Sequence, residues 1–129
     1  MLLDTTVIID LLKGNNDVIN KLASLEKTNT TMMTTSITVF EVWKGSGEIH
    51  DRHKIEKLVL LLESMNILNL DYNSAKEAGI ISANLKKEGK EIEPEDCMIA
   101  GIAKSNRVKL LTRITKHFER IYGLNIETY

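Results

Sequence analysis

Cysteine and proline are almost absent from this sequence, which has one of each, Cys97 and Pro94. A single cysteine cannot form an internal disulfide, so the chain is not a disulfide-stapled scaffold, and its cysteine usage is typical of a reducing compartment. The single proline, without any repeat or low-complexity tract, leaves nothing that marks a linker between domains. We therefore predict a single domain over residues 1–129, a length that buries a core without covalent staples.

The sequence also lacks a long hydrophobic run. Its longest aliphatic run, Leu58–Leu62, is far too short to cross a bilayer. The N-terminal stretch MLLDTTVIIDLLKG has aspartates inside its apolar part and no basic residue before it, unlike a secretory signal. These absences predict a cytoplasmic protein that does not act at a membrane.

Neither sign of charge is in excess, since 17 basic and 18 acidic side chains leave a formal net charge of −1. This balance argues against a protein that holds nucleic acid by bulk electrostatics alone. The basic residues are nevertheless concentrated near the C-terminus, where six of them and one acid lie between Lys104 and Arg120. A local basic strip is therefore compatible with the nearly neutral total.

Hydrophobic periodicity alternates between short apolar strands and amphipathic helices along the chain. Strands are predicted at residues 1–3, 30–36, 66–70, 108–112 and 124–127. Helices are predicted at residues 7–12, 17–27, 37–44, 49–65, 75–89 and 115–122, with a further one beginning at Pro94. This alternation predicts an α/β fold with a parallel sheet and helices on both faces.

Three carboxylates fall where predicted strands end or where the following helices begin. Asp4 ends the first strand, Glu41 follows the second by one helical turn, and Asp96 lies in the first turn of the helix after Pro94. In a parallel sheet the ligand site lies beyond the carboxyl ends of the strands, so we expect these acids to share one edge.

Each acid also has an ordinary structural explanation. Asp4 fits an N-cap for a helix starting at Thr5, and Glu41 with Thr38 fits the capping box T-x-x-E. Asp96 fits the positive end of a helix dipole. If the three carboxylates share one edge, however, their repulsion requires a cation, and Mg²⁺ or Mn²⁺ suits such hard oxygen ligands. A metal ion bound in this way supports hydrolysis of a phosphodiester.

Four segments together resemble the PIN-domain ribonucleases, and most of all the toxin subunits of VapBC-type toxin-antitoxin pairs. They are LLDTTVIIDLLKG at the start, TVFEVWKG around Glu41, EIEPEDCMIAGIA around Asp96 and LLTRITKHFERIYGL near the end. The resemblance implies a single PIN-like domain, a doubly wound α/β/α sandwich with a short, mainly parallel central sheet. It also implies a metal-dependent endoribonuclease that cuts RNA, is usually a homodimer, and is inhibited by a small VapB-type antitoxin whose C-terminal segment covers the site.

The resemblance assigns five residues to the site. Asp4, Glu41 and Asp96 fall on the family's acidic positions, which implies that they bind the metal ion and carry the catalysis. Thr6 falls where a small polar residue often supports the first acid, and Thr112 falls where a hydroxyl often faces the site.

The chain departs from the family's pattern at Ile114, where a fourth Asp or an Asn often follows the Thr-Arg pair. Isoleucine cannot bind a metal ion or its water. We therefore expect one Mg²⁺ or Mn²⁺ ion per chain, bound by Asp4 and Asp96, with Glu41 holding or activating a water.

Basic residues near the C-terminus are candidates for contacting the RNA backbone, because lysine and arginine position phosphates without reading bases. Arg113 is the first candidate and Lys116 the second. The same group contains Lys104, Arg107, Lys109, His117 and Arg120. The competing interpretation for most of them is an ordinary solvated helix face.

Four other residues receive structural interpretations. Asp10 could be a supporting acid, but we predict an ordinary polar position on a short helix, and we predict that Cys97 is a small buried hydrophobe. Trp43 and Tyr72 are predicted to lie in the core or in an interface rather than to stack on bases.

Two function hypotheses remain open. The first is the metal-dependent endoribonuclease toxin, and the alternative is a PIN-like module, weakened in catalysis by Ile114, that mainly binds its antitoxin or RNA. A phosphatase of the haloacid dehalogenase type is disfavoured because it needs a second Asp where this chain has Thr6. Helix-turn-helix DNA binding is disfavoured by the alternation with strands and by the net charge.

Overall fold

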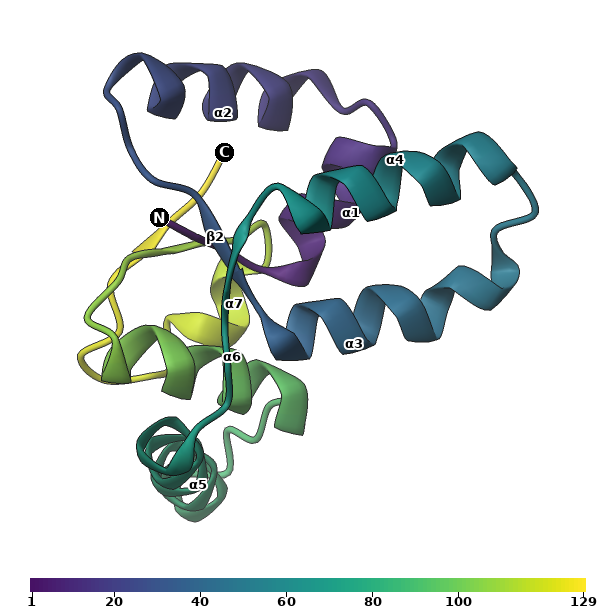
Figure 1. The fold of residues 1–129 in the computed structure, drawn as a ribbon. Helices are drawn as coiled ribbons and strands as arrows, with labels where there is room; N and C mark the ends of the chain where they lie inside the picture. Colours follow the sequence, from purple (N-terminus) through teal and green to yellow (C-terminus); the bar gives the residue numbers. More distant parts are fainter.

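Five short strands form the central sheet of the computed structural model, which describes all residues 1–129 (Figure 1). They are β1 (Leu2–Leu3), β2 (Met33–Thr35), β3 (Asn66–Leu68), β4 (Leu110–Leu111) and β5 (Ile126–Glu127). Their spatial order is β3-β2-β1-β4-β5, and every neighbouring pair is parallel. The chain builds one half of the sheet outward from β1 and then returns beside β1 to build the other half. The predicted doubly wound α/β fold is therefore confirmed, and its switch point lies between β1 and β4.

Successive side chains of β1 and β4 enter two separate cores. Leu2 and Leu110 belong to one buried cluster, whereas Leu3 and Leu111 belong to the other, and all four are fully buried. This division follows from the strand geometry, because neighbouring side chains of a strand point to opposite faces of the sheet. Both faces must therefore be covered by helices.

Helices cover both faces of the sheet, with α1, α2 and α4 on one side and α5 and α6 on the other (Figure 1). The first group, to which α3 also belongs, bounds the cluster that contains Leu3. Its members are α1 (Thr5–Leu12), α2 (Asn16–Lys27), α3 (Ser36–Gly45) and α4 (Arg52–Glu63). The second group bounds the cluster that contains Leu2, and consists of α5 (Tyr72–Lys87), α6 (Pro94–Ser105) and α7 (Thr115–Phe118).

A glycine lets α5 and α6 pack closely. A Cβ atom added at Gly101 would lie 2.5 Å from the carbonyl oxygen of Ser74 and 2.8 Å from the Cβ of Ala78. Such distances are far below van der Waals contact, so only glycine fits at this crossing. The close packing fixes α6, and with it the acidic first turn that contains Asp96.

Two predicted helices are shorter in the structure. The helix expected at residues 49–65 is α4, which begins at Arg52 because the carboxylate of Asp51 accepts a hydrogen bond from the backbone N–H of His53 at 3.0 Å. The helix expected at residues 115–122 is α7, which ends at Phe118, after which Ile121 turns back into the core. None of the helices combines the length and the apolar character needed to span a membrane.

Candidate functional site

Asp4 lies at the switch point, directly after β1, and its carboxylate is almost fully buried, with 2% of the residue exposed. Its Oδ1 accepts hydrogen bonds from Thr6 Oγ1 at 2.7 Å and from the backbone N–H of Val7 at 3.1 Å, and its Oδ2 accepts one from Thr112 Oγ1. Asp4 is thus the N-cap of α1, but its cap role uses only one of the three hydrogen bonds. Burial raises the pKa of Asp4, because desolvation outweighs these hydrogen bonds, and the nearby Asp96 carboxylate raises it further.

Glu41 extends from the middle of α3 toward α1. The N-cap of α3 is Thr35, whose hydroxyl accepts a hydrogen bond from the backbone N–H of Thr38 at 2.9 Å. The predicted capping box between Thr38 and Glu41 is therefore wrong, because Thr38 already lies inside the helix. The Oε2 of Glu41 instead accepts a hydrogen bond from Thr5 Oγ1.

The pKa of Glu41 is also raised. Partial burial is the largest cause, and the carboxylates of Asp96, Glu95 and Asp4 add to it, against the hydrogen bond from Thr5. Glu41, Asp4 and Asp96 therefore interact electrostatically although they come from three different segments of the chain. The three acids therefore lie near one another, as expected, while their role in metal binding stays a prediction.

Asp96 lies in the first turn of α6, two residues after Pro94, and its side chain is 17% exposed. Its Oδ2 lies 2.7 Å from Nδ1 of His117 on α7. No other side chain or backbone N–H donates to this carboxylate.

The oxygens that remain free decide whether the site fits a metal ion. No three acidic, histidine or cysteine side chains converge closely enough to hold an ion by themselves. Glu41 Oε1 and Asp96 Oδ1, however, accept no hydrogen bond from the protein, and no buried polar atom lacks a partner, so both oxygens face solvent. Open carboxylate oxygens are nevertheless the kind of ligand that suits Mg²⁺ or Mn²⁺, which retain several waters and take few direct protein ligands.

Two threonines connect Asp4 to the loop after β4. Thr6 accepts a hydrogen bond from the backbone N–H of Arg113 at 3.1 Å, and Thr112 accepts one from the backbone N–H of Ile114 at 3.0 Å. Since both hydroxyls donate to Asp4, they fix the carboxylate and the loop together. Thr6 and Thr112 are the two residues to which the resemblance assigned supporting hydroxyl groups.

Asp10 is not the ordinary polar position predicted from the sequence. It is 2% exposed, both of its oxygens accept hydrogen bonds from Arg113 Nη1 at 2.8 Å, and the Tyr129 hydroxyl donates to it at 2.9 Å. The sequence does contain one sign that Asp10 lies near the site. Asp10 follows Thr6 by four residues on α1 and therefore shares its helical face. Thr5 and His117 were likewise missed as partners of Glu41 and Asp96, because nothing in the local sequence indicates which distant acid they contact.

The predicted basic strip divides into paired and unpaired side chains. Lys104 forms an ion pair with Glu77 at 2.6 Å, and Arg113 is held by Asp10. Lys116 is exposed and lines a surface hollow with Lys90, Arg120 and the acidic Glu119.

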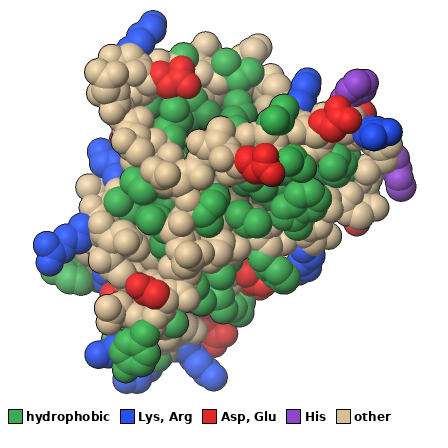
Figure 2. All heavy atoms as spheres, in the orientation of Figure 1, with side chains coloured by type: hydrophobic (Ala, Val, Ile, Leu, Met, Phe, Trp, Pro, Cys, Tyr) green, Lys and Arg blue, Asp and Glu red, His purple; other side chains and the backbone are tan.

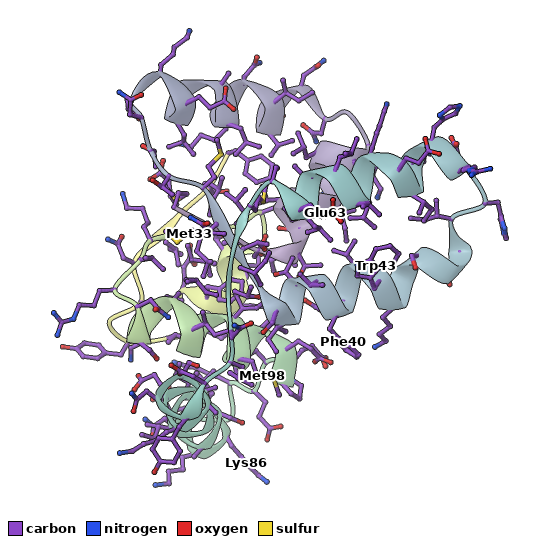
Figure 3. The ribbon with its side chains drawn as sticks, viewed as in Figure 1. Met33, Phe40, Trp43, Glu63, Lys86 and Met98 are labelled. Carbon is purple, nitrogen blue, oxygen red and sulfur yellow. The ribbon has the colours of Figure 1, made fainter.

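Figure 3 shows Phe40 extending outward from α3 and Trp43 on the side of α3 that faces α4. Phe40 is 57% exposed and Trp43 is 42% exposed, so Trp43 is not part of the core, and Tyr72 at 80% is not either. Apolar side chains also gather on the surface over α3 and α4 (Figure 2). A groove between α1 and α3 lies beside Glu41 and is lined by Ile9, Leu12 and Val42.

Cys97 is buried, as predicted.

The sequence matches the family model of the PIN domain over residues 1–124. It is 36% identical to ribonuclease VapC3 of Methanocaldococcus jannaschii over 100 residues, which cover 78% of this chain and 94% of that protein. It is 28% identical to the tRNA(fMet)-specific endonuclease VapC of Shigella flexneri over 130 residues, which cover 99% of this chain and 96% of that protein.

Solved structures are similar over the whole fold. One similar structure is a chain of VapBC2 from Rickettsia felis, bound to a DNA fragment from its promoter. It has a TM-score of 0.89 at 26% identity, and the match covers 99% of this chain and 97% of that chain. A chain of VapBC-1 from nontypeable Haemophilus influenzae has a TM-score of 0.85 at 31% identity. The match covers 98% of this chain and 96% of that chain.

Proposed function

Because this chain belongs to the PIN-domain family, as an endoribonuclease toxin of the VapC type, we propose that it cuts RNA with one divalent ion at Asp4, Glu41 and Asp96. The observation that carries this proposal is that Asp4 is buried at the switch point, while Glu41 and Asp96 each keep an oxygen that accepts no hydrogen bond from the protein. Asp4 and Asp96 would hold Mg²⁺ or Mn²⁺, partly through water. One ion per chain is proposed because Ile114 supplies no fourth ligand.

A divalent ion at this site supplies positive charge against the charge that grows on the phosphodiester, and it acidifies a water. The residues of the chain have complementary tasks. Glu41 would accept a proton from the attacking water at Oε1, and its raised pKa makes it a stronger proton acceptor once it is ionised. Thr6 and Thr112 would keep the Asp4 carboxylate in one orientation through their hydrogen bonds.

Lys116 is the proposed contact to the RNA backbone, since it is exposed and shares its hollow with Lys90 and Arg120. Arg113 was the first candidate from the sequence. It stays a candidate because 54% of its side chain is exposed, although its Nη1 is already bound by Asp10.

A VapB-type antitoxin is the proposed protein partner. The structural neighbours are VapBC complexes, and this chain exposes Phe40 and Trp43 on the helix that carries Glu41. An apolar segment of the antitoxin that covers α3 would also fill the groove lined by Ile9 and Val42 and block access to Glu41.

We also propose that the toxin forms a homodimer, which light scattering of the purified chain tests.

RNA cleavage by the purified protein tests the proposed activity. We expect cleavage with Mg²⁺ or Mn²⁺, none with EDTA, and loss of cleavage with retained RNA binding in Asp4→Asn and Asp96→Asn.

The second candidate function, a module that mainly binds RNA or its antitoxin, is favoured by the absence of a preformed group of three ligands and by Ile114. A parent protein that binds RNA but never cuts it would establish that second function.

A further inference from the structure

Asp96 is the one site carboxylate that is held by an imidazole. Asp4 and Glu41 are held by threonine hydroxyls from neighbouring elements. The Oδ2 of Asp96, in contrast, lies 2.7 Å from His117 Nδ1 and has no other partner in the protein. At this distance the pair forms a hydrogen bond, and an ionised carboxylate can only accept it, so Nδ1 carries the proton.

The position of His117 is fixed by the core. Its neighbour on α7, Phe118, is fully buried in the cluster that contains Ile99 and Ala103 of α6. The backbone N–H of Ile114, at the start of α7, donates to Thr112, which is itself bonded to Asp4. The segment that contains His117 is therefore held at both ends, by the hydrogen bond from Ile114 to Thr112 and by the buried ring of Phe118.

His117 follows Ile114 by three residues, on the short helix α7. Ile114 is the N-cap residue of α7 and makes no side-chain cap hydrogen bond. Its apolar side chain cannot orient a carboxylate, whereas the imidazole one turn further along α7 contacts Asp96 directly.

We propose that His117 is a positioning residue for Asp96. By donating its Nδ1 proton to Oδ2, it holds the carboxylate in one rotamer and leaves Oδ1 directed toward the divalent ion. This inference rests on the proposed function, since the orientation of Asp96 affects the reaction only if Asp96 binds the ion. Hydrogen-bond partners of metal ligands typically contribute about 10- to 100-fold to metal affinity.

Titration calorimetry with Mn²⁺ tests the proposal in four variants and the parent. His117→Ala should weaken Mn²⁺ binding by roughly 10- to 100-fold. His117→Asn should restore most of the affinity, because the amide nitrogen of Asn occupies the place of Nδ1. His117→Gln should not restore it, because its amide nitrogen occupies the place of Nε2. His50→Ala is the matched control, since His50 is exposed in the α3–α4 connection and its replacement should leave the affinity unchanged.

The hydrogen bond itself is tested without any metal ion. Nitrogen-15 NMR of the imidazole rings, recorded at a pH well above the ordinary histidine pKa of about 6.5, should show His117 as the Nδ1–H tautomer. The Asp96→Asn variant should lose this tautomer preference, whereas His50 should show no change.

The outcomes separate this inference from the proposed function. If the parent binds no Mn²⁺, the proposed function fails and the role of His117 fails with it. If the parent binds Mn²⁺ and His117→Ala binds it equally well, only the role of His117 is overturned. Rescue by Gln and not by Asn, or an Nε2–H tautomer in the parent, would also overturn it, because His117 would then act through its other nitrogen.

Discussion

At the scale of single residues, burial determines how the site responds to protons and metal ions. Asp4 is buried next to other carboxylates, so a metal-free protein must hold several negative charges at one edge of its sheet. A divalent ion relieves this repulsion in the folded state only. Ion binding and fold stability are therefore linked.

Metal ions should therefore raise the melting temperature of the parent protein. An ion at 100 times its dissociation constant stabilises the folded state by about 2.7 kcal/mol through mass action. Asp96→Asn should show a much smaller rise with Mg²⁺ or Mn²⁺ because it removes a ligand. Glu63→Gln, which removes the same charge from an exposed position on α4, is the control and should respond like the parent. Thermal scans with and without ion measure the effect, and equal rises in Asp96→Asn and the parent would refute the role of Asp96.

Asp4 should also make the metal-free protein less stable as the pH rises. Its pKa in the folded state is raised by burial, so the folded protein binds the proton more tightly than the unfolded chain does. The resulting stability is fully present below the ordinary carboxylate pKa of about 4 and is lost as the pH rises through the raised value. Comparing the melting temperatures of the parent and Asp4→Asn from acid to neutral pH isolates this contribution. The parent should fall relative to the variant, and parallel curves would contradict the prediction.

At the scale of elements, the crossing of α5 over α6 determines where Asp96 lies. Gly101→Ala should destabilise the fold by about 1–3 kcal/mol, because the new Cβ would overlap the Ser74 carbonyl oxygen, which belongs to the backbone of α5. Gly79→Ala on α5 is the matched control: its Cβ meets nothing within 4 Å, so it should stabilise the helix by up to about 1 kcal/mol. Urea unfolding measures both. A neutral Gly101→Ala would show that the helices can separate at little cost.

The segment after β4 contains two basic residues with different expected roles. Lys116→Ala should weaken RNA binding and lower the slope of log K against log salt by about 0.7, the value for one phosphate contact on a single strand. Arg113→Ala should mainly lower stability, because it leaves the buried carboxylate of Asp10 without its cationic partner. Binding isotherms over a salt series and thermal scans distinguish the two. A large change in salt slope in Arg113→Ala alone would reverse the assignment.

At the scale of the whole molecule, the sequence predicts the layers better than the contacts between them. The parallel sheet with helices on both faces follows from apolar periodicity, which acts within a few residues, whereas the doubly wound arrangement was expected from the resemblance. The pairing of Asp10 with Arg113 joins residues that are 103 positions apart, and it depends on how the loop after β4 packs against α1. The contact between Asp96 and His117 likewise depends on the depth to which Phe118 enters the core. Local patterns do not contain that information.

The exposed aromatic residues of α3 are a whole-molecule feature, because the chain leaves about half of Phe40 and Trp43 uncovered. If an antitoxin binds there, Phe40→Ala with Trp43→Ala should abolish neutralisation of the toxin and leave RNA cleavage by the free protein unchanged, since neither ring takes part in the acidic site. Co-expression with a VapB-type antitoxin that neutralises the parent protein measures this effect through cell growth. Tyr122→Ala, which removes an aromatic ring that is 96% exposed, is the control and should remain neutralised. Continued neutralisation of the double variant would show that the antitoxin covers a different surface, and loss of cleavage would show that α3 had been distorted.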